Sequence, residues 1–447
     1  MLFIWLLYYC FSGLVYSEIS QNSVNLNTIL TPQTIEPKLP PLEIAPADQL
    51  TEDKSWTRQQ LQKLWTERES IGHTPIYKFT LPARENVQIV FKNETGTKSG
   101  SLKHRYAWAL VTWALIEGYI KQNTPVFEAS SGNTAASLAY MCKLIGVKFT
   151  AIVPDTIEDV KTEHITQWGA SVIKVPIAER LVRARKFAED HNGFFMNQFG
   201  NSFLAEEFHE SGNYQFESTN MFHEMVNQLN DGNLNGEKLL VPKYFVHAAG
   251  TGGTITSIGR YIKKYMINTQ VVLADTEFSV YWDYVIHSQF TNVSGNSLWV
   301  PPGMAGIGYS PDSPAIKGQT TSLDAAVIDR ALKIPDLAST AAMQVMRKHG
   351  INGGTSTGVN FVAALHLAAQ DTSKDGFMIA TILADSGDNY ETSYFNRTWI
   401  QENFKDPDSL RSYDCWQEAI ENALKLGIDP LSSNECKIRK NSGVKKA

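Results

Sequence analysis

The sequence predicts an α/β protein in which parallel sheets are covered by helices. Short apolar segments alternate with segments of helical periodicity over most of the chain. Because the apolar segments are hydrophobic along their whole length, they fit strands that are buried on both faces of a sheet. An alternating order of strands and helices is typical of parallel sheets. The chain has 447 residues, enough for about two to three domain-sized units, and shows no internal repeat of solenoid length.

The elements of the first half follow one another closely. Segment 87–92 is rich in valine and isoleucine and predicts a strand, and the apolar residues of 104–120 recur at helical spacing. The apolar segment 124–130 predicts a strand, and 135–144 predicts the helix that follows it. The remaining expected elements are a strand at 148–154, a helix end, glycine turn and strand within 165–175, and a helix at 179–191.

The second half repeats this alternation with longer gaps. Segment 243–249 predicts a strand, and 254–264 predicts a helix directly after a glycine-rich turn. Two further apolar segments, 271–275 and 377–385, predict strands. These elements together predict parallel sheets whose strand ends carry the loops in which α/β proteins bind ligands.

The first fifty residues differ from the rest. Residues 2–16 are almost wholly apolar but fewer than the roughly 20 that a membrane-spanning helix needs. Because this segment ends in the small residue Ser17, we expect residues 1–17 to be a signal peptide or, if uncleaved, a signal anchor. Residues 18–50 contain five prolines and no aromatic residue, which predicts a disordered linker. The protein is then in the secretory pathway or extracellular if cleavage occurs, and membrane-anchored otherwise.

Composition excludes several classes of function. The formal net charge is -6, and basic residues cluster only at the extreme C-terminus, so no nucleic-acid surface is expected. The four cysteines form no CxxC pair, which argues against a structural zinc site, and we expect no metal. Cys415 and Cys436 can form a disulfide if the chain is secreted. Of the glycosylation sequons at Asn93, Asn292 and Asn396, we expect Asn93 to stay unmodified because it directly follows a buried strand.

A glycine-rich turn follows the strand expected at 243–249. Gly250, Thr251, Gly252, Gly253 and Thr254 place flexible backbone and two hydroxyls at the start of a helix. Backbone N–H groups and the positive end of the helix dipole suit a phosphate there. A purely structural turn is the alternative. A dinucleotide site is a second alternative, because Asp275 ends the next strand and is a candidate ribose ligand.

Lys103 opens the helix that follows the strand expected at 87–92. A cation at a helix N-terminus is electrostatically disfavoured, so the position favours the neutral amine that a Schiff base requires. A solvated surface lysine is the alternative. A third loop, Ser130, Ser131, Gly132, Asn133 and Thr134, follows the strand expected at 124–130. Its hydroxyls, amide and helix start suit a carboxylate, although the same residue types are ordinary helix caps.

In this order and spacing the three loops resemble those of the cysteine synthase/cystathionine β-synthase family of pyridoxal-phosphate (PLP) enzymes. The resemblance covers roughly residues 56–400 and begins at an IGHTP segment at 71–75. It continues through SGSLKHR, SSGNT, NQF at 197–199, GTGGT, GIG at 306–308, GTSTG at 354–358 and DSGD at 385–388. It implies a two-lobed α/β fold of PLP fold type II, similar to tryptophan synthase β, and a homodimer.

The resemblance also implies roles for single residues. Lys103 falls on the lysine that holds the cofactor as a Schiff base, Asn133 on the partner of its ring hydroxyl, and Ser356 on the partner of its pyridine nitrogen. Gly250–Thr254 would hold the phosphate, and Ser130, Ser131, Gly132, Thr134 and Gln198 would hold the amino-acid substrate. A hydroxyl beside the pyridine nitrogen leaves it largely unprotonated, which weakens the electron sink and favours loss of a β-substituent over transamination.

Departures from the family pattern refine the expected function. Ala135 and His104 stand where cysteine synthases usually have Gly and Asp, and the combination looks more like a cysteine desulfhydrase-like branch. For His104 we expect a helix-surface position beside a carboxylate, with a second catalytic base as the alternative. Tyr281 and Trp282 can shape the substrate pocket or simply pack in the core. No Cys and no His precede His73 within residues 18–73, so no haem site is expected.

We therefore expect β-elimination from L-cysteine to sulfide, pyruvate and ammonia. The alternatives are β-replacement, as in a cysteine synthase or cystathionine β-synthase, a catalytically silent homologue that senses sulfur amino acids, and an NAD-binding dehydrogenase built on GTGGT. The expected catalytic unit is 51–400, in which a smaller lobe at about 105–215 is inserted between 51–104 and 216–400. Residues 401–447 form a C-terminal extension that is too short for the regulatory repeats of cystathionine β-synthase.

Overall fold

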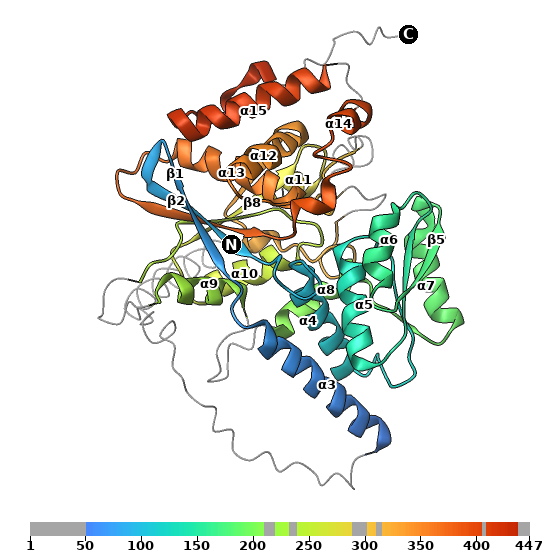
Figure 1. Cartoon of the computed structure of the whole chain (residues 1–447). Helices are drawn as coiled ribbons and strands as arrows, with labels where there is room; N and C mark the ends of the chain where they lie inside the picture. The colour runs from blue at the N-terminus through green and yellow to red at the C-terminus, as the bar shows by residue number, and fades with distance from the viewer. Residues whose placement is uncertain are drawn as a thin grey trace, which may run out of the picture.

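A computed structural model describes the chain in six segments: residues 51–209, 220–231, 239–287, 302–309, 315–404 and 408–436. The expected signal peptide, the linker at 18–50, Asn292 and the basic tail from residue 437 lie outside these segments. The described strands form two sheets with helices packed against both, so the predicted α/β class with parallel sheets is confirmed (Figure 1).

The larger sheet has the strand order β1-β2-β10-β7-β8-β9. Strands β2 (Arg84–Asn93), β10 (Phe377–Leu383), β7 (Tyr244–His247), β8 (Gln270–Thr276) and β9 (Arg330–Ile334) run parallel to one another. Strand β1 (Ile76–Leu81) pairs antiparallel with β2 at one edge. The carboxyl ends of the five parallel strands therefore meet along one side of this sheet, where open α/β sheets bind ligands.

The smaller sheet has the order β5-β4-β3-β6, and all its strands are parallel. Its strands are β3 (Val126–Glu128), β4 (Phe149–Pro154), β5 (Ser171–Val175) and β6 (Phe194–Phe195). All four lie in the sequence between β2 and β7, which pair with the same strand, β10, of the larger sheet. The chain thus leaves the larger sheet after β2, builds the smaller one, and returns (Figure 1).

Helices follow most strands. The α-helices are α3 (Glu52–Ile71), α4 (Lys103–Ile116), α5 (Asn133–Ile145), α6 (Asp159–Thr166), α7 (Arg180–Asp190), α8 (Gln198–His209), α9 (Met221–Leu229), α10 (Gly253–Lys264), α11 (Tyr281–His287), α12 (Asp336–Lys348), α13 (Thr355–Gln370), α14 (Arg397–Asn403) and α15 (Ser409–Leu426). Short 3-10 helices are η2 (Ile177–Glu179), η4 (Ala325–Val327), η5 (Gly387–Tyr390), η6 (Pro430–Ser432) and η7 (Asn434–Cys436). Within the described residues, no helix is long and apolar enough to cross a bilayer.

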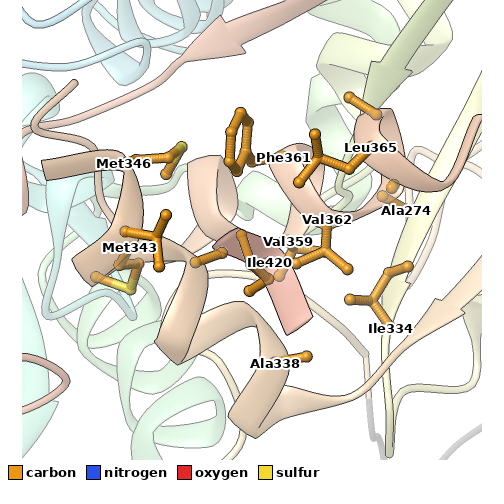
Figure 2. Packing of buried hydrophobic residues seen from close by; sticks show 14 of the residues in the cluster. Ala274, Ile334, Ala338, Met343, Met346, Val359, Phe361, Val362, Leu365 and Ile420 are labelled. Atoms are coloured by element: carbon orange, nitrogen blue, oxygen red, sulfur yellow. The ribbon is translucent and has the colours of Figure 1, made fainter. Parts of the chain in front are cut away.

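The largest hydrophobic core joins the larger sheet to α12, α13 and α15. Figure 2 shows Met343 of α12, Phe361 and Val362 of α13, and Ile420 of α15 packed together beside Ile334 of β9. A disulfide between Cys415 and Cys436 joins α15 to η7, and Cys436 is itself buried in this core. Residues 409–436 of the expected C-terminal extension are therefore packed onto the larger sheet's core.

Candidate active site

The segment that follows β10 joins two of the predicted loops. The Leu102 N–H donates to the Ala384 carbonyl at 2.7 Å, and the backbones of Ser101 and Asp385 form an isolated antiparallel β-bridge. On its other side the Gly354 N–H donates to the Asp385 carbonyl at 3.1 Å. The start of α4 and the start of α13 are therefore held on either side of residues 384–386.

Lys103 is the first residue of α4 and is half-buried. Its Nζ lies 4.8 Å from the centroid of the Tyr106 ring. Two buried groups at strand ends lie within electrostatic range of Lys103: burial lowers the pKa of His247 and Lys103 lowers it further, whereas burial raises the pKa of Asp385 and Lys103 opposes that rise. Burial is the larger cause for His247 and lowers its pKa to about 3, so this imidazole is neutral near pH 7.

Asp385 is the buried polar centre of the site. Its Oδ2 accepts a hydrogen bond from the Asn133 amide at 2.7 Å and another from the Tyr390 hydroxyl at 2.7 Å. Burial raises the pKa of this carboxyl, against the lowering effects of the two hydrogen bonds and of Lys103. Asn133 begins α5, so the third predicted loop lies beside the Lys103 loop although the two are far apart in sequence.

Ser356 lies in the first turn of α13 and is buried, 9% exposed. No side chain caps this helix, whose N-cap is Gly354. A Cβ on Gly354 would lie 2.1 Å from Asp385 Oδ1, so this glycine lets the start of α13 approach the carboxylate. The neighbouring Thr357 Oγ1 is buried and has no hydrogen-bond partner among the described residues.

The Gly250–Thr254 turn leads from β7 into α10. Gly252 has a φ of 88°, a left-handed conformation that favours glycine, and a Cβ on it would meet the Leu323 backbone at 2.3 Å. The Tyr281 hydroxyl donates to the Gly250 carbonyl at 2.7 Å and braces the turn. Tyr281 is fully buried, so of its two sequence-based alternatives the structure supports core packing.

This turn fits the phosphate of pyridoxal phosphate. The N-cap residue Gly252 has no side chain, and the Gly253 N–H makes only a long hydrogen bond, of 3.4 Å, to Thr251 Oγ1, so the first backbone N–H groups of α10 can donate to an anion. Thr251 is buried and Thr254 is partly exposed, and each adds a hydroxyl to the same turn. The structure thus brings Lys103, Asn133 and the start of α13 together around Asp385. The phosphate turn begins shortly after His247, whose pKa is lowered by burial and by the charge of Lys103.

The predicted substrate loop is held to Gln198 by a buried carboxylate. Glu128, the last residue of β3, accepts hydrogen bonds from the Ala129 N–H at 2.9 Å and from the Gln198 N–H at 3.0 Å. Burial raises the pKa of Glu128 to about 7, against these hydrogen bonds. In the loop, Ser130 and Thr134 are buried, Ser131 is partly exposed and Gly132 is exposed.

The expected surface position of His104 is wrong. The ring is fully buried, and its Nε2 lies 3.0 Å from Glu67 Oε1 while its Nδ1 lies 3.0 Å from Ser99 Oγ. The expected carboxylate contact is present, but it comes from α3, which covers the start of α4. Sequence reasoning could not foresee this because α3 was not among the expected elements.

Several residues of the site were not singled out from the sequence. Glu128 carried a usable signal, a carboxylate inside an otherwise apolar strand segment. His247 carried a similar one, an imidazole near the end of a buried strand. Tyr106 and Tyr390 carried none, because aromatic residues are ordinary in helices and turns.

Comparisons with known proteins agree with this geometry. The family described as pyridoxal-phosphate dependent enzyme matches residues 68–385. The chain is 45% identical over 385 residues to the pyridoxal-phosphate dependent protein F13B12.4 of Caenorhabditis elegans, which covers 84% of this chain and 88% of that protein. It is 32% identical over 361 residues to the L-cysteine desulfhydrase Cds1 of Mycobacterium tuberculosis, covering 79% and 92%.

A solved structure shares the fold. The O-acetylserine dependent cystathionine beta-synthase from Helicobacter pylori superimposes with a TM-score of 0.57 over 73% of this chain and 97% of that one. The two sequences are 24% identical, so this likeness concerns the arrangement of the sheets and helices.

Proposed function

Because the chain belongs to the pyridoxal-phosphate dependent enzymes, in their fold type II, we propose that it removes the β-substituent of a small amino acid. L-cysteine is the proposed substrate, and water completes its conversion to sulfide, pyruvate and ammonia. The observation that carries the proposal is the placement of Lys103, Asn133 and the start of α13 around the buried Asp385. The 32% identity to an L-cysteine desulfhydrase supports this choice of substrate.

Each part of the site has a distinct task in this proposal. Pyridoxal phosphate, when bound, supplies the electron sink that the reaction needs. The N-terminus of α10 holds its phosphate, and Asn133, oriented by Asp385, holds the ring hydroxyl. The loop from Ser130 to Thr134 and Gln198 hold the substrate carboxylate.

Lys103 is the residue that moves a proton. Its Nζ holds the cofactor before substrate arrives, and once displaced it takes the proton from the substrate Cα. It can then return that proton to the leaving sulfur. Ser356 supports elimination over transamination, because a neutral hydroxyl does not stabilise a proton on the pyridine nitrogen as a carboxylate does.

The test is a product assay on the purified chain loaded with cofactor. We expect sulfide and pyruvate to appear in equal amounts from L-cysteine, together with a visible absorption band of the bound cofactor. Lys103→Ala should abolish both the band and the sulfide, because this variant lacks the amine that is proposed to hold the cofactor. Lys121→Ala, which removes an exposed lysine after α4, serves as the control that keeps both.

Other outcomes would identify a different function. A wild-type chain that turns over cysteine without cofactor would contradict the cofactor's role. Cysteine formed from O-acetylserine and sulfide, without net sulfide release from cysteine, would identify β-replacement instead, since the two reactions share the same proton transfer at Lys103. A cofactor-loaded chain that binds cysteine without product would indicate a silent binding homologue.

A further inference from the structure

Tyr106 contacts Lys103 through its ring. The two residues lie on one face of α4, about one turn apart, and Lys103 Nζ is 4.8 Å from the ring centroid. Tyr106 is buried, 4% exposed, and Lys103 is half-buried, so water screens this contact only in part. An ammonium over an aromatic face is attracted to the ring's negative quadrupole, whereas a neutral amine is not. The ring therefore favours the protonated form of Lys103.

The hydroxyl of the same residue reaches a second part of the site. Tyr106 donates to the main-chain carbonyl of Gln198 at 2.6 Å. The turn that carries Gln198 has little freedom, because Asn197 is left-handed with a φ of 48° and a Cβ on Gly200 would lie 2.7 Å from the Asn197 amide. With Glu128 holding the Gln198 N–H, Tyr106 completes the fixation of this residue from the side of α4.

We propose that Tyr106 is a positioning residue that acts at two points of the substrate, its Cα and its carboxylate. Its ring stabilises the proton on Lys103 Nζ after the Cα–H bond breaks, and its hydroxyl holds Gln198 where the substrate carboxylate binds. In that step Nζ gains the proton, the electron pair of the C–H bond stays with the substrate and its cofactor, and the proton later leaves with the sulfur. The inference rests on the roles proposed above for Lys103 and Gln198.

Other ionisable groups face Lys103 and do not change with Tyr106. His247 approaches from β7 and is held neutral near pH 7, and Asp385 approaches from the end of β10. His247 contacts Asn360 and Asp385 contacts Tyr390, and neither contact involves Tyr106. A change in Lys103 protonation that appears on loss of the Tyr106 ring, and not on loss of its hydroxyl alone, is therefore assigned to the ring.

Two substitutions separate the two contacts. Tyr106→Phe keeps the ring and removes the hydroxyl, so KM for L-cysteine should rise about 3- to 10-fold while the pH profile of kcat is unchanged. Tyr106→Leu removes the ring as well, so the acid limb of the kcat profile should move roughly 0.5 to 1 pH unit lower. Tyr244→Phe is the matched control and should change neither quantity. It also removes the hydroxyl of a buried tyrosine, here bonded to Asp371, but Tyr244 begins β7, at the end away from His247 and the phosphate turn.

A second measurement does not depend on turnover. The full chain is freed of cofactor, treated briefly with acetic anhydride at a series of pH values, and the acetylated fraction of Lys103 is measured by peptide mass spectrometry. The pH of half-maximal reactivity should be the same in wild type and Tyr106→Phe and lower in Tyr106→Leu. If the leucine variant does not fold, fluorinated phenylalanine in place of Tyr106 weakens the negative ring face at nearly constant shape and should give the same shift.

The two readouts separate this inference from the proposed function. If the variants left both KM and the Lys103 midpoint at wild-type values, the role of Tyr106 would be wrong even in a chain that releases sulfide. If the Lys103 midpoint shifted as expected in a chain that releases no sulfide, the ring contact would stand and the proposed reaction would fail.

Discussion

The two carboxylate oxygens of Asp385 fix the positions of the residues around them. A buried carboxylate needs partners, and Asp385 finds them in the amide of Asn133 and the hydroxyl of Tyr390. Its second oxygen lies so close to Gly354 that no side chain fits between them. The Asn133 amide has two N–H donors, and the bond to Asp385 uses one of them. The carboxylate can therefore orient the amide while the second N–H donates to a ligand oxygen.

Gly354→Ala tests this packing. The backbone φ of -80° suits alanine, so the only obstacle is the new methyl group, 2.1 Å from Asp385 Oδ1 and 2.5 Å from a Tyr390 ring carbon. We expect Asp385 to be displaced from Asn133, cofactor affinity to fall about tenfold, and the free energy of unfolding to fall by about 1–3 kcal/mol. Titration of the cofactor into the cofactor-free chain measures the affinity. Gly96→Ala is the control, since a Cβ there meets nothing within 4 Å, and equal affinities for both variants would contradict the role of Asp385.

Ser356→Asp tests the assigned partner of the pyridine nitrogen. A carboxylate beside the ring nitrogen stabilises its proton, deepens the electron sink and should slow loss of the β-substituent while transamination rises. Sulfide release and long-wavelength absorbance are measured on folded, cofactor-loaded protein, because a buried unpaired carboxylate also destabilises the fold by about 1–3 kcal/mol. Ser356→Ala, which removes the hydroxyl without adding charge, is the comparison. Unchanged sulfide release and spectrum in Ser356→Asp would transfer the assignment to Thr355 or Thr357.

At the scale of elements, the site is a set of loops that strand ends bring together. Glu128 ends β3 and fixes both the loop before α5 and the start of α8, so one buried carboxylate sets the distance between two substrate-binding segments. Burial raises its pKa from 4.5 to about 7. The unfolded chain therefore releases this proton at a lower pH than the folded protein does.

This difference in the pKa of Glu128 predicts that its contribution to the free energy of unfolding falls as the pH rises from 4.5 to 7. Below pH 4.5 Glu128 is protonated in both states and favours neither, and as the pH rises through 7 the folded state loses about 3 kcal/mol relative to the unfolded one. Urea unfolding from pH 4.5 to 8 should show a shallower decline in Glu128→Gln than in wild type. Asp336, whose pKa is also raised to about 7, contributes equally to both proteins. Parallel stability curves for the two proteins would show that Glu128 keeps an ordinary pKa.

The strands were more predictable from sequence than the helices were. Each strand and helix expected from apolar runs and helical periodicity is present within a few residues, because both patterns report burial directly. Strands β1, β6 and β9 were missed; each lies at a sheet edge and is only partly buried. Helices α3, α8, α9 and α11 to α15 were not expected either. The loops were located by their residue types, but their meeting was not, since the Asn133–Asp385 contact joins segments 252 residues apart and leaves no local pattern.

At the scale of the whole molecule, a cluster of buried charged residues joins α4 to β2 of the larger sheet and to α9. Arg105 of α4 pairs with Glu94 at 2.8 Å and with Glu224 of α9 at 2.6 Å, and Lys92 of β2 reaches Glu224 at 3.1 Å. These groups are desolvated, and Glu224 also pairs with Arg68 at 2.8 Å, so removing Arg105 would take one of three cations from Glu224 and the ion-pair partner at 2.8 Å from the buried Glu94. Since Arg105 lies in the same helical turn as Lys103, the cluster also fixes the start of α4 against the larger sheet.

Two covalent features of the chain bear on the secretory route that the sequence analysis expects, and we propose that route for experimental test. The Cys415–Cys436 disulfide closes α15 onto the core, and such bonds persist in oxidising compartments. The sequon asparagines described by the structure differ in access. Asn93 ends β2, is 7% exposed and donates to the Tyr77 hydroxyl at 3.3 Å, whereas Asn396 is exposed at the N-cap of α14.

Expression through a secretory pathway should therefore modify Asn396 and not Asn93. A glycan on Asn93 has no room beside β1 and the Lys103 loop, so chains that carried one could not complete the larger sheet. Peptide mapping of the folded, cofactor-loaded fraction should find glycan on Asn396, and Asn396→Gln should remove its mass whereas Asn93→Gln should not. The N-terminus of the same material should begin at Glu18 if the segment through Ser17 is cleaved as a signal peptide. Glycan on Asn93 in folded protein would contradict the position of β2, and an intact N-terminus on a membrane-bound, glycosylated chain would show that the segment is an anchor.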